Sequence, residues 1–323
     1  MASPGVPQRT RSNNEGEYGP RPQLQVGIGR AIAHHGELLQ GVFEGDDDHL
    51  HRGLVTLPLP IQQVIATFWP RQDDPIRTRP RNRPKAARAV ALTLKHLGFE
   101  HWGGDLTIES GISIGYGYGS STADVVAAIR AIAAASSVVL CRSTICRLAI
   151  AAEEASDAIV YGDQAVLFAH REGTCLEHFG GALPPLLVVG FRDGSSAQID
   201  TLRLPRVQYS SEEIQLFKVL RALVFRSVRE QNPHMLGRVA TTSAEISQRH
   251  LPKPHWEAVS RLAAELGALG VQVAHSGTLF GILLDPDKSG AAATAARLAK
   301  TVKREGFKDV QTFALNAEGT WLP

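Results

Sequence analysis

The chain has 323 residues, of which 43% are hydrophobic, enough for one large domain or two smaller ones. Its 34 Lys and Arg residues nearly balance its 32 Asp and Glu residues, for a formal net charge of +2. This balance lacks the strong positive charge that is typical of nucleic-acid-binding proteins. The longest apolar stretches, such as residues 186–189, are too short to cross a bilayer. We therefore expect neither a nucleic-acid partner nor a membrane partner.

Residues 1–23 are polar and rich in Pro, Gly, Arg and Asn, with no apolar segment of the kind that a secretory signal needs. They are predicted to form a disordered tail, and an Arg-rich transit peptide is the alternative. The three cysteines, Cys141, Cys146 and Cys175, are odd in number and lack CxxC spacing, which argues against a disulfide framework or a zinc site. Reduced thiols favour a cytoplasmic location.

The first half of the chain is predicted to mix strands with helices. Segments rich in β-prone residues predict strands over 24–33, 55–57, 63–68, 105–109, 165–168 and 186–191. Helical periodicity predicts helices over 84–97, 121–135 and 143–155, with Ser143 as the N-cap of the last. Two segments are predicted as loops: 34–41, which begins His-His-Gly-Glu, and 70–84, which has five Arg and four Pro.

The second half is richer in helices. Helices are predicted over 211–229, 235–249, 255–269 and 289–305, and strands over 271–274, 280–284 and 310–315. Strands and helices do not alternate regularly, which favours an α+β architecture over a doubly wound parallel sheet. The composition shifts near 201–210, so we expect two domains, 24–205 and 206–323.

A glycine-rich loop precedes the predicted helix at 121–135. Three glycines at alternate positions let the backbone approach a bulky anion, and the following hydroxyls and helix N-terminus offer further donors. These residues are Gly115, Gly117, Gly119, Ser120, Ser121 and Thr122. The loop has no lysine for a Walker motif, and its glycines do not fit GxGxxG spacing. A phosphate site is therefore predicted, with a simple connector that caps a helix as the alternative.

The stretch Ile114–Asp124 resembles the second motif of the GHMP kinases, a family named for the galactose, homoserine, mevalonate and phosphomevalonate kinases, although the motif proline is absent. Its Ser-Ser-Thr-Ala-Asp ending is similar to that of the L-threonine kinases of cobalamin side-chain synthesis. Further segments resemble motifs of that branch, in the family's order: 36–41 (GELLQG), 154–157 (EASD), 167–173 (LFAHREG) and 274–278 (AHSGT).

The resemblance implies an α+β GHMP kinase fold, with a left-handed βαβ unit in an N-terminal ATP-binding domain and a ferredoxin-like C-terminal domain. It implies an ATP- and Mg²⁺-dependent kinase that phosphorylates a hydroxyl group, with conversion of L-threonine to O-phospho-L-threonine as the leading reaction. Another hydroxy amino acid, an amino alcohol or a specialised metabolite is the alternative acceptor. A catalytically inactive ligand-binding sensor of the same fold is the alternative of another class, and a homodimer is left open.

Roles for individual side chains follow from the resemblance. Asp157 is assigned as the general base, with Asp163 as its rival. Ser121, with Ser120 as second choice, and Glu154 are assigned as Mg²⁺ ligands, because magnesium prefers hard oxygen donors. Glu153 is interpreted as a solvated helix residue.

Glu37 is expected to pair with an ammonium group of the acceptor. Neighbouring residues of an extended segment point to opposite sides, so at most one of His34 and His35 reaches the site, and we assign His35. The turn of His275, Ser276 and Gly277, which resembles a glycine motif of the branch, is expected to approach phosphate or substrate. Ser276 and Gly277 are assigned to substrate binding, with an ordinary hairpin turn as the alternative. The role of Arg30 is left open.

Overall fold

The computed structural model describes residues 23–194 and 207–318. These ranges form ten strands: β1 (Gly27–Glu44), β2 (Leu50–Gln72), β3 (Ile76–Arg79), β4 (Trp102–Ser110), β5 (Gln164–Ala169), β6 (Thr174–Ala182), β7 (Leu186–Arg192), β8 (Gly270–Val273), β9 (Leu279–Leu284) and β10 (Lys308–Leu315). They also form seven α-helices: α1 (Pro84–His96), α2 (Ser120–Ala135), α3 (Arg142–Glu153), α4 (Ser211–Glu230), α5 (Pro233–His250), α6 (Trp256–Glu265) and α7 (Ala291–Arg304). None of the described helices combines the length and apolar character needed to cross a bilayer.

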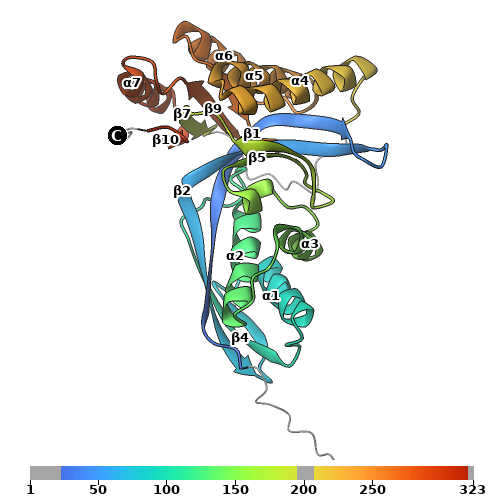
Figure 1. Ribbon diagram of the computed structural model, residues 1–323. Coiled ribbons are helices and arrows are strands. Elements are labelled where there is room, and N and C mark those ends of the chain that lie inside the picture. The colour runs from blue at the N-terminus through green and yellow to red at the C-terminus, as the bar shows by residue number, and fades with distance from the viewer. Residues whose placement is uncertain (1–22, 195–206, 319–323) are drawn as a thin grey trace, which may run out of the picture.

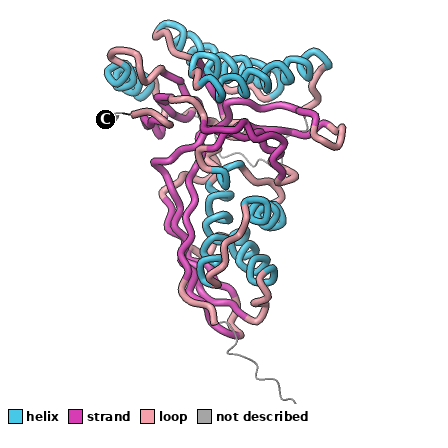
Figure 2. Tube along the Cα trace, in the orientation of Figure 1, coloured by secondary structure: helices cyan, strands magenta, loops and turns pink. Residues whose placement is uncertain are grey.

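Two long strands, β1 and β2, pair antiparallel and run through both parts of the molecule (Figure 1). In the lower part, β2 also pairs antiparallel with β4, and β4 pairs in parallel with the short β3. Helices α1, α2 and α3 lie together on one side of these strands (Figure 2). The long pair therefore supplies one continuous framework on which the helices of the first half rest.

In the upper part, β1 meets the strands of the second half. Glu37 of β1 pairs with Val273 of β8, and the sheet continues through β9, β7 and β10. Helices α4, α5 and α6 lie above these strands (Figure 1). This irregular order of strands and helices confirms the predicted α+β class. The predicted boundary near residue 205 lies outside the described residues, and β7, which precedes it, pairs with β9 and β10.

The prediction of a loop at 34–41 is wrong, because β1 continues without a break through this segment. Its pairing with β2 shifts register between His34 and Glu37 and again before Leu39. Gly36 has a φ of +72°, a left-handed conformation that glycine adopts without strain. The polar His-His-Gly-Glu sequence resembles a turn, but here it forms a β-bulge where the strand passes between the two parts.

The other differences concern edges and ends. The predicted loop at 70–84 contains the end of β2 and all of β3, which pairs with β4 at the edge of the sheet. β6, at 174–182, was not predicted, and it pairs with β5. Helix α3 is capped by Cys141 rather than Ser143, and it ends at Glu153 because Glu154 has a φ of +69°. Residues 1–22 of the predicted tail lie outside the described part of the chain.

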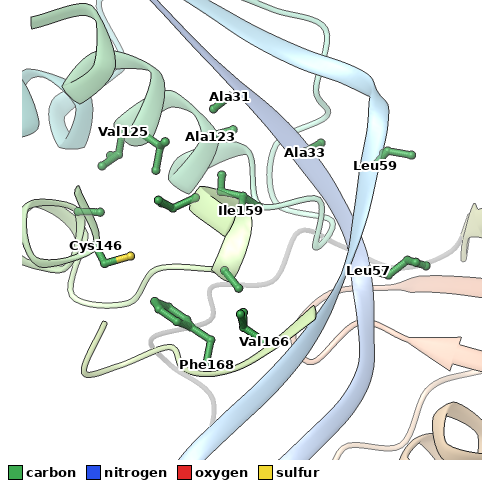
Figure 3. Close-up of a cluster of buried hydrophobic side chains, with 14 of the residues drawn as sticks. Ala31, Ala33, Leu57, Leu59, Ala123, Val125, Cys146, Ile159, Val166 and Phe168 are labelled. Carbon is green, nitrogen blue, oxygen red and sulfur yellow. The ribbon is translucent and has the colours of Figure 1, made fainter. Parts of the chain in front are cut away.

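The main core fills the space between the long strands and helices α1, α2 and α3. Figure 3 shows part of this cluster, in which Val125 of α2, Cys146 of α3 and Phe168 of β5 gather with Ile159. A second cluster lies between β7, β9 and the helices α6 and α7. Tyr118 of the glycine-rich loop belongs to the first cluster, so the loop is anchored in the main core.

The closest approach of a helix to the sheet depends on glycine. A Cβ on Gly29 of β1 would overlap the Ala127 carbonyl oxygen and the Ala131 nitrogen of α2. These atoms belong to the helix backbone, so a larger side chain is accommodated only if the whole helix moves. The start of α2 and the glycine-rich loop would move with it.

Gly29→Ala is therefore expected to lower the free energy of unfolding by about 1–3 kcal/mol, the range typical of overpacking. Urea denaturation measures the change. Gly111→Ala is the matched control, since a Cβ there meets no atom within 4 Å. Equal stability of the two variants would contradict the packing role of Gly29.

Candidate active site

The glycine-rich loop follows β4 and leads into the first turn of α2. Gly115, Gly117 and Gly119 have φ angles of +84°, +102° and +67°, which other residues adopt only with strain. Helix α2 begins at Ser120, so its unpaired N–H groups face the loop. A Cβ on Gly119 would overlap the His34 ring and lie 2.9 Å from the Asp157 carboxylate. The loop therefore forms a cradle for an anion beside these two side chains.

The turn between β8 and β9 holds the loop from the other side. The Thr278 amide donates to the Tyr116 carbonyl oxygen over 3.1 Å, and the His34 amide donates to the Tyr118 carbonyl oxygen, also over 3.1 Å. A Cβ on Gly117 would lie 2.6 Å from the Ser276 carbonyl oxygen. Backbone contacts with both β1 and the β8–β9 turn thus fix the shape of the loop.

A cavity of about 240 Å³ lies over the loop. Its walls include all six residues that the sequence assigned to nucleotide binding: Gly115, Gly117, Gly119, Ser120, Ser121 and Thr122. They also include the assigned base Asp157 and the assigned substrate residues Glu37 and Ser276. Segments that are far apart in the sequence therefore meet at one cavity.

His34, Asp157 and Glu37 form a charged cluster in this cavity. His34 Nε2 lies 3.1 Å from Asp157 Oδ2, and His34 Nδ1 lies 3.8 Å from Glu37 Oε1. Burial alone would lower the pKa of His34, but the charge and hydrogen bond of Asp157, together with Glu37, raise it to about 9. At neutral pH the imidazole is therefore a cation.

The two carboxyl groups of the cluster respond differently. Burial alone would raise the pKa of Asp157, but the His34 charge and hydrogen bond lower it to about 2. Burial raises the pKa of Glu37 to about 7, against the opposing charge of His34. Ligand atoms of the three residues lie within 4.8 Å of one another, a spacing that a metal ion can bridge. The proton that His34 retains to about pH 9 competes with a metal, so we interpret the cluster as an ion-pair network.

A second acidic group faces the start of α2. The Ser121 hydroxyl donates to Glu153 Oε2 over 2.7 Å, and Lys85 Nζ of α1 lies 4.0 Å from the same oxygen. Burial raises the pKa of Glu153 to about 7, while hydrogen bonds from Ser121 and Thr122 oppose the shift. A hydroxyl and a carboxylate beside a phosphate cradle are hard oxygen donors of the kind that Mg²⁺ prefers.

Two histidines line the cavity opposite the loop. The His170 and His275 rings lie 5.3 Å apart, edge to face, and His275 Nδ1 lies 3.0 Å from Gln40 Oε1. Burial lowers the pKa of His170, and it lowers the pKa of His275 to about 3. Both rings are therefore neutral at physiological pH and add no positive charge to the cavity.

The structure places five residues considered from the sequence away from this cavity, among them the rival base Asp163, which is exposed. Glu154 is exposed, and it is Glu153 that faces the loop. His35 is fully buried on the opposite side of β1, with its Nδ1 2.7 Å from Gln272 Nε2. Gly277 lines an adjacent cavity, and Arg30 is exposed on β1.

Local backbone geometry explains why His35 and Glu154, which were assigned to the site, lie outside the cavity. The β-bulge at Gly36 reverses the alternation of side chains, so His34 rather than His35 shares a side with Glu37. Helix α3 ends at Glu153, two residues before the predicted end at 155, which leaves Glu154 in a left-handed C-cap conformation. Lys85 and His170 were also missed as cavity residues, whereas the turn that carries His275 was expected to approach phosphate or substrate. His170 and His275 lie within segments that matched family motifs, so the signal for them was present.

Comparisons with known proteins agree with this geometry. Residues 84–170 match the model of the GHMP kinases N terminal domain. The L-threonine kinase of Salmonella typhimurium is 30% identical over 279 residues, which cover 85% of this chain and 88% of that protein. The L-threonine kinase of Citrobacter freundii is 29% identical over 272 residues, 81% of this chain and 88% of that protein.

Solved structures show the same fold at low identity. Homoserine kinase from Cytophaga hutchinsonii superimposes with a TM-score of 0.61 at 15% identity, over 98% of this chain and 99% of that chain. Mevalonate kinase from L. major gives a TM-score of 0.60 at 14% identity, over 91% and 96%. The chain belongs to the GHMP kinase family. It is a phosphotransferase with the GHMP kinase fold, as the motifs predicted.

The charged cluster predicts a pH-dependent stability. Because the folded protein raises the pKa of His34 from 6.5 to about 9, the pair contributes stability that is complete below pH 6.5 and lost as the pH rises through 9. Between pH 7 and 9.5, the free energy of unfolding of wild type should fall by on the order of 1 to 3 kcal/mol more than that of His34→Gln.

Urea denaturation at the two pH values measures this difference. His96→Gln, at the exposed end of α1, is the control and should follow wild type. Comparing each variant with wild type cancels the contributions of groups that titrate in the same pH window away from His34. Lys253 is one of them, because burial lowers its pKa to about 8. Equal losses in wild type and His34→Gln would show that His34 carries no stabilising proton.

Proposed function

We propose that this GHMP kinase transfers the γ-phosphoryl group of ATP to the hydroxyl of a small hydroxy amino acid, with L-threonine as the acceptor. The observation that carries the proposal is the pairing of Asp157 with His34 at the edge of the phosphate cradle, in one cavity. The two relatives named above are L-threonine kinases, which supports this acceptor. By resemblance to that branch, the product would serve the synthesis of the cobalamin side chain.

The reaction needs positioning and charge neutralisation more than covalent chemistry from the protein. Backbone N–H groups of residues 115–121 and the start of α2 would hold the triphosphate. The acceptor oxygen forms a bond to the γ-phosphorus while the bond from phosphorus to the β,γ-bridging oxygen breaks, so ADP leaves. The proton of the acceptor hydroxyl passes to the Asp157 carboxylate.

His34 gives Asp157 its character. An aspartate with a pKa near 2 is a weak base, so it acts first by orienting the acceptor hydroxyl. It accepts the proton only as the oxygen becomes acidic during bond formation. The His34 imidazolium stabilises the carboxylate before transfer and lies close to the negative charge that develops on the phosphoryl oxygens.

The magnesium site is proposed at Ser121 and Glu153. Their oxygens face the cradle, and the donor set suits a hard cation. When bound, the ion would offset charge on the β- and γ-phosphates. Lys85 lies close enough to hold the Glu153 carboxylate in its ionised form as the ion binds. Glu154, the ligand expected from the motif, is replaced in this proposal by its neighbour.

The acceptor's amine is assigned to Glu37. Its carboxyl group is 2% exposed and lines the cavity close to the reacting end. Burial raises the pKa of Glu37 to about 7, so an ammonium group that enters the cavity would favour its ionised form. An acceptor with an amine near its hydroxyl therefore fits this wall better than a plain alcohol does.

An acceptor screen tests the function. Purified protein with Mg-ATP should release ADP with L-threonine at a higher kcat/KM than with L-serine, L-homoserine, 1-amino-2-propanol or galactose, and O-phospho-L-threonine should appear by phosphorus NMR. Tight ATP binding without turnover of any acceptor would instead indicate a ligand-binding sensor. Turnover restricted to another acceptor would replace L-threonine in the proposal.

Asp157→Asn should lower kcat by about 10²–10⁴-fold, because the amide cannot accept the proton. Its Kd for ATP, measured by calorimetry, should stay close to that of wild type, since the loop holds the nucleotide. Asp163→Asn is the matched control, because Asp163 is exposed and lies outside the cavity. Undiminished turnover in Asp157→Asn would remove the residue from the mechanism.

Glu153→Gln and Glu154→Gln separate the two candidate metal ligands. Loss of a charged ligand should raise the Mg²⁺ concentration at half-maximal rate by about 10–100-fold in Glu153→Gln. Glu154→Gln, at the exposed neighbouring position, should leave the magnesium titration unaltered. The reverse pattern would restore the motif position as the ligand, and no effect in either variant would exclude this wall as the metal site.

A further inference from the structure

A second cavity, of about 220 Å³, adjoins the first. His275 and Ser276 line both of them, so the two cavities meet at the turn between β8 and β9. The remaining walls come from this turn, from residues 250–254 at and just after the end of α5, and from Asp193 and Phe280. A ligand that lies across His275 and Ser276 would contact both cavities.

Lys253 supplies the second cavity with a positive charge. Its Nζ donates to the Gly277 carbonyl oxygen over 2.8 Å, and an ammonium group has two further donors. Burial lowers the pKa of Lys253 to about 8, and no carboxylate in the described part of the chain opposes this shift. Lys253 is half-buried, and a cation in such a position that lacks a carboxylate partner favours an anion from outside.

The backbone around Lys253 is held in place. Pro252 and Pro254 flank the residue and fix φ on both sides. The Lys253 amide donates to Gln248 Oε1 over 2.7 Å. The ammonium group is thus presented from a restrained segment, and an incoming anion would need little further ordering of the chain.

Thr278 adds a hydroxyl to the same cavity. Its Oγ1 is buried and has no hydrogen-bond partner among the residues that the structure describes. An unpaired buried hydroxyl costs about 1–3 kcal/mol, so a ligand that bonds to it gains affinity. Asp193, the carboxylate in this cavity, lies 3.8 Å from His255 Nε2. The Lys253 ammonium and the Thr278 hydroxyl therefore line one cavity, and two such donors suit a carboxylate.

The charges at the two ends of the paired cavities act on one ring. The pKa of His275, which burial lowers most strongly, is lowered further by Lys253 and raised by Asp157. His275 therefore lies within electrostatic range of both groups. Hydroxy amino acids carry both a hydroxyl and a carboxylate, which suits two adjoining cavities that hold a base in one and a cation in the other.

We propose that the second cavity holds the carboxylate of the acceptor, with the Lys253 ammonium and the Thr278 hydroxyl as its donors. The inference rests on the proposed function, because it assigns the other end of the same acceptor. It makes Lys253 a specificity-determining residue that distinguishes hydroxy amino acids from amino alcohols with the same hydroxyl and amine.

Paired kinetics with L-threonine and L-threoninol test the inference, since threoninol lacks only the carboxylate. Wild type should prefer L-threonine. In Lys253→Met, kcat/KM for L-threonine should fall at least about 30-fold, the effect expected for removing one partner of a buried charge pair, while that for threoninol changes little. Lys253→Arg should keep part of the preference for L-threonine over threoninol. Thr278→Val should lower this preference by a smaller factor than Lys253→Met does.

The controls separate recognition from structure. Lys95→Met, on the exposed end of α1, should match wild type, and the KM for ATP should be unchanged in Lys253→Met. An equal loss with both acceptors, or a higher KM for ATP, would show that Lys253 only braces the turn at Gly277 and would overturn the inference. If wild type turned over carboxylate-free alcohols alone, both the proposed acceptor and this site would fall. L-threonine turnover with an unchanged preference in Lys253→Met would overturn the site and leave the function standing.

Discussion

The β-bulge of β1 at Gly36 is the constraint on which the catalytic cavity depends. In a regular strand His34 and Glu37, three residues apart, would point to opposite faces of the sheet. The left-handed Gly36 shifts this alternation by one position, so Nδ1 of His34 and Oε1 of Glu37 come within 3.8 Å. A Cβ at Gly36 would lie 2.8 Å from the Ala274 amide nitrogen, so the bulge also brings β1 close to the end of β8.

The positions of the other site elements follow from this bulge. The amide of His34 anchors the glycine-rich loop at Tyr118, and the loop in turn touches the β8–β9 turn through Tyr116. The cradle is therefore braced between a strand of the first half and a turn of the second half. Small displacements of either part would change the distance between phosphate and acceptor, to which phosphoryl transfer is sensitive.

The sequence predicted most elements and the position of the glycine-rich loop before α2, because helical periodicity and alternate glycines are local signals. The phosphate-binding role of the loop stays a prediction. Helix α1, for example, runs from Pro84 to His96 against a predicted 84–97. The site was predicted less completely. His35 was chosen over His34 by applying regular alternation across a segment where a bulge breaks it, and such a bulge is set by pairing with β2 and contact with β8. Glu154 was chosen by motif position, whereas a left-handed C-cap turns it away from the loop.

Because the cation beside Asp157 is a histidine, its charge depends on the neighbouring carboxylates. A lysine or arginine would carry its charge regardless of its neighbours at neutral pH. Burial alone would remove the proton from His34, and only Asp157 and Glu37 retain it. Neutralising either carboxylate therefore lowers the pKa of His34, and the other carboxylate then has a weaker ion-pair partner. In the proposed reaction, transfer of the acceptor's proton would neutralise Asp157. The imidazolium would then become more acidic, and its proton would be held chiefly by Glu37. The pair of carboxylates around one histidine thus couples the base to the residue assigned to the acceptor's amine, a coupling that a fixed cation would not provide.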